Sequence, residues 1–334
     1  MKKIKPHGLF VFNHFMDILE ELLNKAGKQK NPALWLYRND ARTPLFMLEA
    51  LARLYTGVNK ENKFIKLDAK FKLLEDTLGA IDYYDVFAKE FIQNKKIPAE
   101  VTAYMQAQAR EKTQQLNEIL TEKKWLNENN DSINKIRKKL SNADWKKEAA
   151  DIKSIHHFYT DAINHILVFV NKEDFHFENI ETDVHELRRK LRWLSIYPQA
   201  LLGSVQLRKQ KKYPAYLHKY MDKETVNSPF NKMPNAGTNK HFLLLSKDYL
   251  YSLSWLIAEL GKIKDNGLRV IVIKEALQQI SSLSDEEALK KVYQITGSKQ
   301  LGIQQLVNKA DSVCKTYFKE KNLEKLVIGI STIK

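Results

Sequence analysis

Four nitrogen-rich side chains gather in one short segment, which runs from Asp183 to Leu194. On a helix they would fall within one arc, and these residues are His185, Arg188, Arg189 and Arg192. An apolar stripe lies beside that arc, formed by Val184, Leu187, Leu191 and Leu194. Arginine can donate two parallel hydrogen bonds to phosphate or carboxylate oxygens. The segment therefore predicts a helix that buries one face and presents a wall of an anion-binding groove, with a solvated basic face as the alternative.

Helices must position these side chains, because the chain contains few residues that interrupt helices. Its 334 residues include only 11 Gly and 8 Pro, while Leu, Lys, Glu, Ala, Ile and Gln recur in long periodic runs. We predict an all-α fold with helices over 9–25, 40–55, 64–78, 82–93, 98–123, 145–170, 183–194, 242–260, 265–279, 284–296 and 299–319. Gly79 and Gly261 are expected to end helices. The apolar tail, 326–333, is predicted to form a short strand or to pack against the bundle.

The charge balance favours an anionic partner. A formal net charge of +15 and a pI near 9.5 raise the local concentration of anions, which leaves nucleic acid, inorganic polyphosphate and acidic membranes as partners. No run reaches the ~18 apolar residues that a membrane helix needs. We expect no membrane insertion and a cytoplasmic protein, and polyphosphate granules are one place where it would be found. The single cysteine, Cys314, excludes an intramolecular disulfide and is expected in the core.

A basic insert, about 207–240, separates two helical regions of the second half. It carries eight Lys or Arg against Asp222 and Glu224 and contains several turn-forming residues, so we expect a surface excursion. Four of its cations could extend an anion-binding surface, namely Arg208, Lys209, Lys211 and Lys212. Nearby tyrosines could stack on bases, which makes nucleic acid the alternative ligand. A solvated loop is the simpler interpretation.

The two halves of the chain resemble each other. At an offset of 146 residues Arg42 falls on Arg188, and at an offset of 182 residues Gly79 falls on Gly261. Several apolar positions align in the same two registers, and the change of register is about the length of the insert. The sequence therefore predicts two tandem repeats, each like a four-helix bundle, over 1–142 and 143–334.

Over nearly its whole length the chain resembles the CHAD domain, a family of helical domains named for their conserved histidines, and the second repeat carries the closer match. The resemblance rests on a His-x-x-Arg-x-x-x-Arg helix followed by a Leu-Gly-x-x-Lys-Asp motif, here His185, Arg188, Arg192, Leu260, Gly261, Lys264 and Asp265. It implies two four-helix bundles related by a pseudo-twofold axis, and a basic central groove that binds inorganic polyphosphate. It implies no catalytic activity for the domain itself.

The first repeat departs from this pattern. Asn39, Arg42 and Phe46 occupy the positions of the His-Arg-Arg motif, and Asp82 stands where a base is usual. We therefore expect anion binding mainly in the second half. The candidate anion-binding residues are His185, Arg188, Arg189, Arg192, Lys264, Arg42, Arg208, Lys209, Lys211 and Lys212. Asp265 is expected to cap a helix or to orient an arginine.

Enzymatic signatures are missing from the sequence. It has no phosphate-binding loop, dinucleotide-binding fingerprint, zinc-protease motif or nucleophile elbow. His157, Asp161 and His165 share a helical face, but no facing Glu-x-x-His pair would complete a metal site. We expect a non-catalytic protein without cofactor or metal that binds polyphosphate. The alternatives are a module that binds nucleic acid or an acidic protein through the insert, and a helical scaffold that has lost anion binding.

Overall fold

The computed structural model describes residues 6–127, 129–172, 175–212, 214–297 and 301–333. Within these ranges the chain is mostly helical, with one small three-stranded sheet, so the expected α-helical class is confirmed apart from that sheet. No helix in the described part of the chain is long and apolar enough to cross a membrane.

The regular elements of the first half are all helices in residues 6–127 and 129–142. They are α1 (His7–Ala26), α2 (Pro32–Arg38), α3 (Arg42–Asn59), α4 (Asn62–Gln93), α5 (Ala99–Glu122) and α6 (Asp131–Ser141). Their apolar positions follow the helical period, and this explains why α1 buries Phe12, Met16 and Leu19 on one face. The first half therefore follows the predicted helices apart from Gly79, and it adds α2 and α6, which the sequence pattern did not predict.

The second half combines helices with the sheet. Its longer elements are α7 (Glu148–Lys172), α8 (Glu186–Ala200), β1 (Val205–Arg208), β2 (His241–Ser246), α10 (Lys247–Ser281), α11 (Asp285–Thr296), α12 (Ile303–Lys319) and β3 (Val327–Thr332). Its short elements are a π-helical turn (Ile180–His185), α9 (Lys223–Asn227), and two 3₁₀ turns (Ala215–Tyr220 and Pro229–Asn231).

Two long helices cross the molecule, and both correct the sequence prediction. α4 has 32 residues and continues through Gly79, and α10 has 35 residues and continues through Gly261. A Cβ atom on Gly79 would lie 2.7 Å from an Arg42 nitrogen, and one on Gly261 would lie 3.1 Å from Nε of Arg188. These glycines therefore make room for a guanidinium group beside the helix instead of ending it.

The sheet replaces the start of an expected helix. Phe242–Leu245 were predicted to be helical, but they lie in β2, which pairs in parallel with β1 and antiparallel with β3. A short continuous apolar run fits a buried strand as well as a buried helix, so periodicity could not separate the two. The apolar tail does form a strand, β3, as one of its two predicted outcomes.

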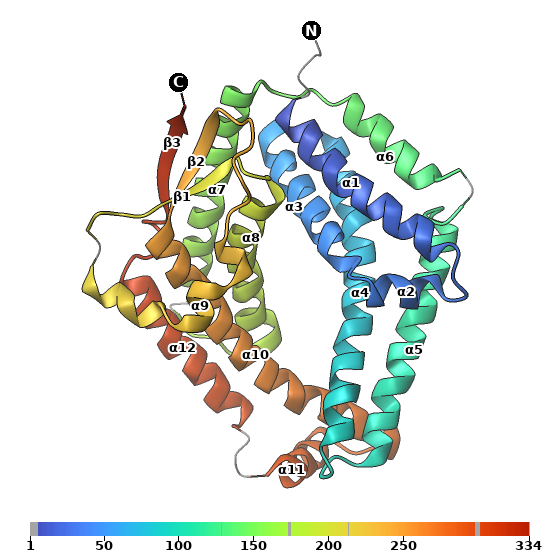
Figure 1. The fold of residues 1–334 in the computed structure, drawn as a ribbon. Helices are drawn as coiled ribbons and strands as arrows, with labels where there is room; N and C mark the ends of the chain where they lie inside the picture. Colours follow the sequence, from blue (N-terminus) through green and yellow to red (C-terminus); the bar gives the residue numbers. More distant parts are fainter. Residues whose placement is uncertain (1–5, 128, 173–174, 213, 298–300, 334) are drawn as a thin grey trace.

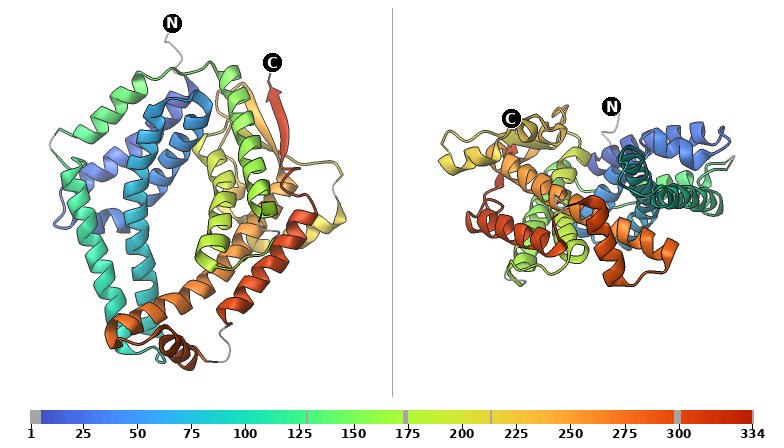
Figure 2. Two further views of the ribbon diagram at one scale, coloured as in Figure 1. Left: turned by 180° about the vertical axis from the view of Figure 1, so that it is seen from behind. Right: turned by 90° about the horizontal axis from the view of Figure 1, so that it is seen from below.

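Two apolar cores hold the helices together. The larger core takes buried residues from both halves, among them Tyr55 and Leu194. The smaller core joins Phe91 and Met105 of α4 and α5 to Val272 and neighbours on α10. Figures 1 and 2 show the C-terminal half of α10, with α11, crossing over to the far ends of α4 and α5. α4 and α10 therefore meet at one end of the molecule while their other ends are held in the larger core. The division at residue 142 stays a prediction.

The insert packs more closely than a surface excursion would. Leu217 and Tyr220 are buried, and the Asn231 side chain donates to the backbone oxygen of Thr225 and accepts from the Ser254 hydroxyl of α10. Its cations nevertheless face solvent, which accounts for its polar composition.

Candidate functional site

A central cavity of about 1100 Å³ opens between α3, α4, α8 and α10. Arg42 enters it from α3, Asp82 from α4, Arg188 and Arg192 from α8, and Lys264 from α10. The helix predicted over 183–194 begins earlier than expected, with the π-helical turn that carries His185. The Asn179 side chain caps this turn by accepting hydrogen bonds from the backbone amides of Glu181 and Thr182. The structure thus brings together five of the predicted site residues around one space: Arg42, His185, Arg188, Arg192 and Lys264.

The lining of this cavity is mixed in charge. Its basic side chains include the five residues just named and Arg269, whereas its carboxylates are Asp82, Glu90, Glu181, Asp265 and Glu275. The family resemblance implies a basic central groove, whereas the described residues line this cavity with acids as well as bases. What each cation can do depends on whether a carboxylate already holds it.

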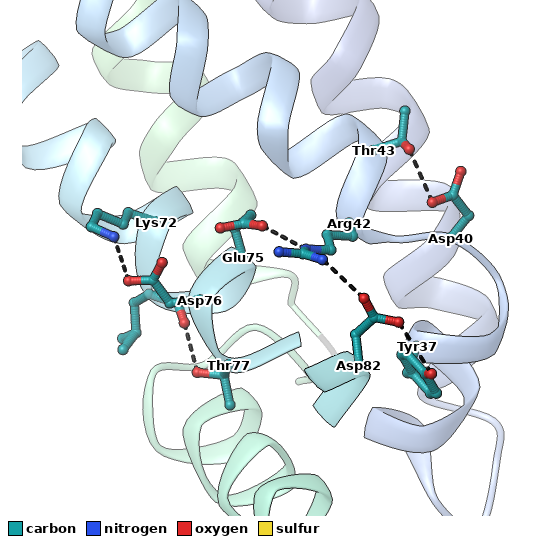
Figure 3. Close-up of polar contacts among 10 residues, drawn as sticks. Tyr37, Asp40, Arg42, Thr43, Lys72, Glu75, Asp76, Thr77 and Asp82 are labelled. Carbon is teal, nitrogen blue, oxygen red and sulfur yellow. Dashed lines mark hydrogen bonds and ion pairs between the residues drawn. The ribbon is translucent and has the colours of Figure 1, made fainter. Parts of the chain in front are cut away.

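Arg42 is held by two carboxylates. Its Nε lies 2.6 Å from Oε1 of Glu75, and its Nη1 lies 3.2 Å from Oδ2 of Asp82 (Figure 3). The Tyr37 hydroxyl lies 3.3 Å from the other Asp82 oxygen, although its shorter contact, 2.7 Å, is with Asp85. Glu75 is only 5% exposed, so its carboxylate is shielded from water, although the Arg42 side chain is partly exposed. Arg42 has little capacity left for an external anion.

Arg188 and Arg192 differ from Arg42 because neither forms an ion pair with a carboxylate in the described ranges. Nε of Arg188 donates to the backbone oxygen of Ile257 over 3.2 Å, and the Arg192 guanidinium lies 4.5 Å from the centre of the Phe46 ring. Burial, followed by repulsion from Arg188 and Arg42, lowers the pKa of Arg192 to about 10. Both the lowered pKa and the missing partner mark a cation that an anion would stabilise, and at neutral pH it still carries its charge.

The remaining predicted cations of the helix have intramolecular partners. Nδ1 of His185 lies 2.9 Å from Glu181, and hydrogen bonding to His185 lowers the pKa of that glutamate. Arg189 lies outside the central cavity, is more than half exposed, and pairs with Glu186 at 2.8 Å. These side chains would have to leave a carboxylate before they could bind an anion.

Lys264 and Asp265 correct a further expectation. They were predicted at a helix start, but they lie near the middle of α10, so Asp265 caps no helix. Nζ of Lys264 lies 2.8 Å from Oδ1 of Asp265. The Asp265 charge also favours the protonated form of Arg188, although burial is the larger influence and lowers the pKa of that arginine. An orienting role for Asp265 is thus electrostatic, without a direct hydrogen bond among the contacts described.

A smaller side cleft of about 150 Å³ adjoins Arg42, Arg188 and Arg192, which together form an arginine cluster. Arg42, Arg188 and Arg192 line it too, together with Arg189 and Glu49. Glu49 is 2% exposed, and burial raises its pKa to about 7, while Arg53 at 2.9 Å opposes that shift. Glu49 and Glu75 were not among the residues predicted from the sequence. Glu49 lies among the apolar residues of α3, and an acid in such a position is the sequence feature that could have identified it.

The other predicted residues lie elsewhere. The insert cations Arg208, Lys209, Lys211 and Lys212 are exposed and do not line the central cavity. Cys314 is buried in the core, as expected, and burial raises the pKa of its thiol. Among the described residues, His157, Asp161 and His165 belong to no group of three or more side chains that could hold a metal ion.

Comparisons with known proteins do not identify a relative. No protein-family model, no curated protein and no solved structure matches the chain. The interpretation of the site therefore rests on its own geometry and on the resemblance described above.

Proposed function

We propose that the protein binds inorganic polyphosphate, or a similar polyanion, without catalysis, and that Arg188 and Arg192 form the principal contact. The observation that carries this proposal is the Arg192 guanidinium, which burial and two neighbouring arginines destabilise more than the Glu75 charge stabilises it, and which forms no ion pair in the described ranges. A phosphate group would supply the missing negative charge and accept several guanidinium hydrogen bonds. If polyphosphate is the ligand, we expect the protein in the cytoplasm, at polyphosphate granules.

Two features support a pair of repeats related by a pseudo-twofold axis. Arg42 lies against Gly79 in the first half, and Arg188 lies against Gly261 in the second, as the two sequence offsets require. Phe46 also contacts Arg192, and these two positions are equivalent at the offset of 146 residues. Equivalent positions meet at a twofold axis, so this contact favours an axis through the arginine cluster.

The test is a titration with long-chain polyphosphate at low salt, in which isothermal calorimetry measures the binding. Arg188→Gln combined with Arg192→Gln should weaken binding by about tenfold or more, because each lost charge-assisted hydrogen bond contributes about 1.5–3 kcal/mol. Arg110→Gln is the control, since Arg110 is exposed on α5 and lines none of the cavities described above. Unchanged affinity in the double variant would refute the site, and no binding by the wild-type protein would refute the function.

A second candidate is a nucleic-acid or acidic-protein binder that uses the insert. It is favoured by the four exposed insert cations, Arg208, Lys209, Lys211 and Lys212, which form no ion pair in the described part of the chain. Replacing all four with Gln separates the two candidates. An insert binder should lose most of its affinity for RNA or DNA, whereas a cavity binder should keep its affinity for polyphosphate.

A further inference from the structure

A lysine groove lies outside the site described above. It is a hollow of about 480 Å³ between the first turns of α4 and the outer helix α6, lined chiefly by Lys63, Lys66, Lys70, Lys135, Lys138 and Lys139. Ile136 and Asn142 complete the lining, so the residues that form it include no carboxylate. The groove therefore differs from the central cavity, in which acids and bases are mixed.

The groove and the central cavity occupy opposite faces of α4. Lys63, Lys66 and Lys70 are spaced by three and four residues and share one face. At 100° per residue, Gly79 and Asp82, which line the cavity, fall on the other side of the helix. A ligand in the cavity cannot also lie in the groove without passing around α4, so the groove is a separate site.

The lysines that face one another across this groove are poorly compensated. Lys66, Lys135, Lys138 and Lys139 are exposed and form no ion pair within the ranges that the structure describes. Lys63 is different, because it pairs with Glu61 at 2.7 Å and donates to the backbone oxygen of Asn142 at 2.8 Å.

Lys70 lies at the inner side of the groove. It stands 5.8 Å from the centre of the Trp125 ring, and burial, followed by repulsion from Lys139, Lys135 and Lys123, lowers its pKa. The two helices therefore hold a set of like charges that an anion would relieve.

The chemistry of the lining selects the kind of anion. Lysine ammonium groups are donors only, and Asn142 is the one lining residue with a side-chain acceptor. A peptide would bring backbone N–H donors that find few acceptors there, and nucleic-acid bases would need aromatic platforms. Trp125 cannot serve as one, because it is 1% exposed. Ile136 is equally buried and offers nothing for insertion into a bilayer.

We propose that the lysine groove binds a chain of inorganic polyphosphate, independently of the central cavity. Such a chain carries acceptors only and has no bases or donors that need partners. Lysines at steps of three and four residues lie about 4.5–6 Å apart along each helix, so an extended chain can contact successive ammonium groups from both walls. The groove shares its ligand with the proposed function, but it uses different residues and does not depend on Arg188 or Arg192.

The test compares two variants of equal charge. The groove variant carries Lys66→Gln, Lys135→Gln, Lys138→Gln and Lys139→Gln, and leaves Lys63 and Lys70 in place because they hold neighbouring structure. The control carries Lys290→Gln, Lys291→Gln, Lys309→Gln and Lys315→Gln on α11 and α12. These four lysines are also exposed, and they line neither the groove nor the cavity.

Binding of fluorescently labelled polyphosphate is measured by anisotropy over a range of salt concentrations. The groove variant should lose affinity, and its dependence of log K on log salt should become shallower by about one for each lysine that contacts phosphate. The control should lose affinity only slightly and keep the wild-type slope. Equal losses in the two variants would overturn the groove, because net charge alone would then explain the effect.

The same assay separates the groove from the cavity. A loss in the groove variant with none in the Arg188→Gln, Arg192→Gln variant supports the groove and contradicts the proposed contact at Arg188 and Arg192, whereas no binding by the wild-type protein would refute the function and the groove together. The reverse pattern contradicts the groove and supports the cavity. Competition with poly-uridylate at equal phosphate concentration checks the ligand, since displacement of polyphosphate from the groove by the RNA would overturn the choice of a base-free chain.

Discussion

Arg42 in the first half and Arg188 in the second half occupy similar settings with different partners. Each guanidinium lies against a glycine of a long helix, Gly79 or Gly261. Glu75 stands four residues before Gly79, and its carboxylate lies 2.6 Å from Arg42. Ile257 stands four residues before Gly261, and its backbone oxygen accepts from Arg188 at 3.2 Å.

The residues that follow the two glycines reinforce this difference. Three residues after the glycine stands Asp82 in the first half and Lys264 in the second. The first half therefore uses its arginine in an internal ion pair, which stabilises the fold. The second half leaves Arg188 and Arg192 without an ion-pair partner in the described ranges, which costs stability but keeps them available for a ligand. The predictions below test this division, from the largest expected effect to the smallest.

Arg42→Met should lower the free energy of unfolding by about 3 kcal/mol, because it leaves the buried Glu75 carboxylate without its partner. Urea denaturation measures the loss. The double variant Arg42→Met, Glu75→Met should recover most of it, since no buried charge is then left unpaired. If the single and double variants are equally unstable, the ion pair does not explain the effect.

Ile257→Glu should convert the second half to the arrangement of the first. The new carboxylate would face Arg188 and lower the affinity for polyphosphate by up to about a hundredfold, the equivalent of a strong charge-assisted hydrogen bond. Ile271→Glu adds the same charge farther along the same cavity wall and should have a smaller effect. Calorimetric titration compares the two, and equal losses would argue against a local effect at Arg188.

Glu49→Gln should change the pH dependence of stability. Burial raises the pKa of Glu49 from 4.5 to about 7, so the folded state keeps a proton that the unfolded state releases. The wild-type free energy of unfolding should therefore fall by about 2 kcal/mol as the pH rises from 4.5 to 7, and this decline should be weaker in the variant. Urea denaturation across this range measures both proteins. Parallel profiles would contradict the assignment.

Arg192→Met should raise the free energy of unfolding by about 1 kcal/mol in the absence of ligand, because it removes a desolvated cation that Arg188 and Arg42 repel. The same variant should bind polyphosphate more weakly. Thermal denaturation with and without polyphosphate measures both effects. A variant that is less stable than the wild type without ligand would show that Arg192 serves the fold.

Helical periodicity predicted a large part of the architecture. Val184, Leu187, Leu191 and Leu194 are all buried, as the apolar stripe required. The ends of helices were harder to predict, because a glycine can either end a helix or admit a neighbour from another helix. Gly79 and Gly261 admit arginines, and that depends on residues far away in the chain.

The sequence by itself determined the helical class, the buried faces and the set of arginines that gather near one another. It could not determine which arginines remain without a counter-charge. That was decided by tertiary packing, which places Glu75 against Arg42 across 33 residues of chain and Ile257 against Arg188 across 69. The physical reason is the short reach of an ion pair in a solvated protein: a carboxylate neutralises only the cation that the fold brings within a few ångströms of it.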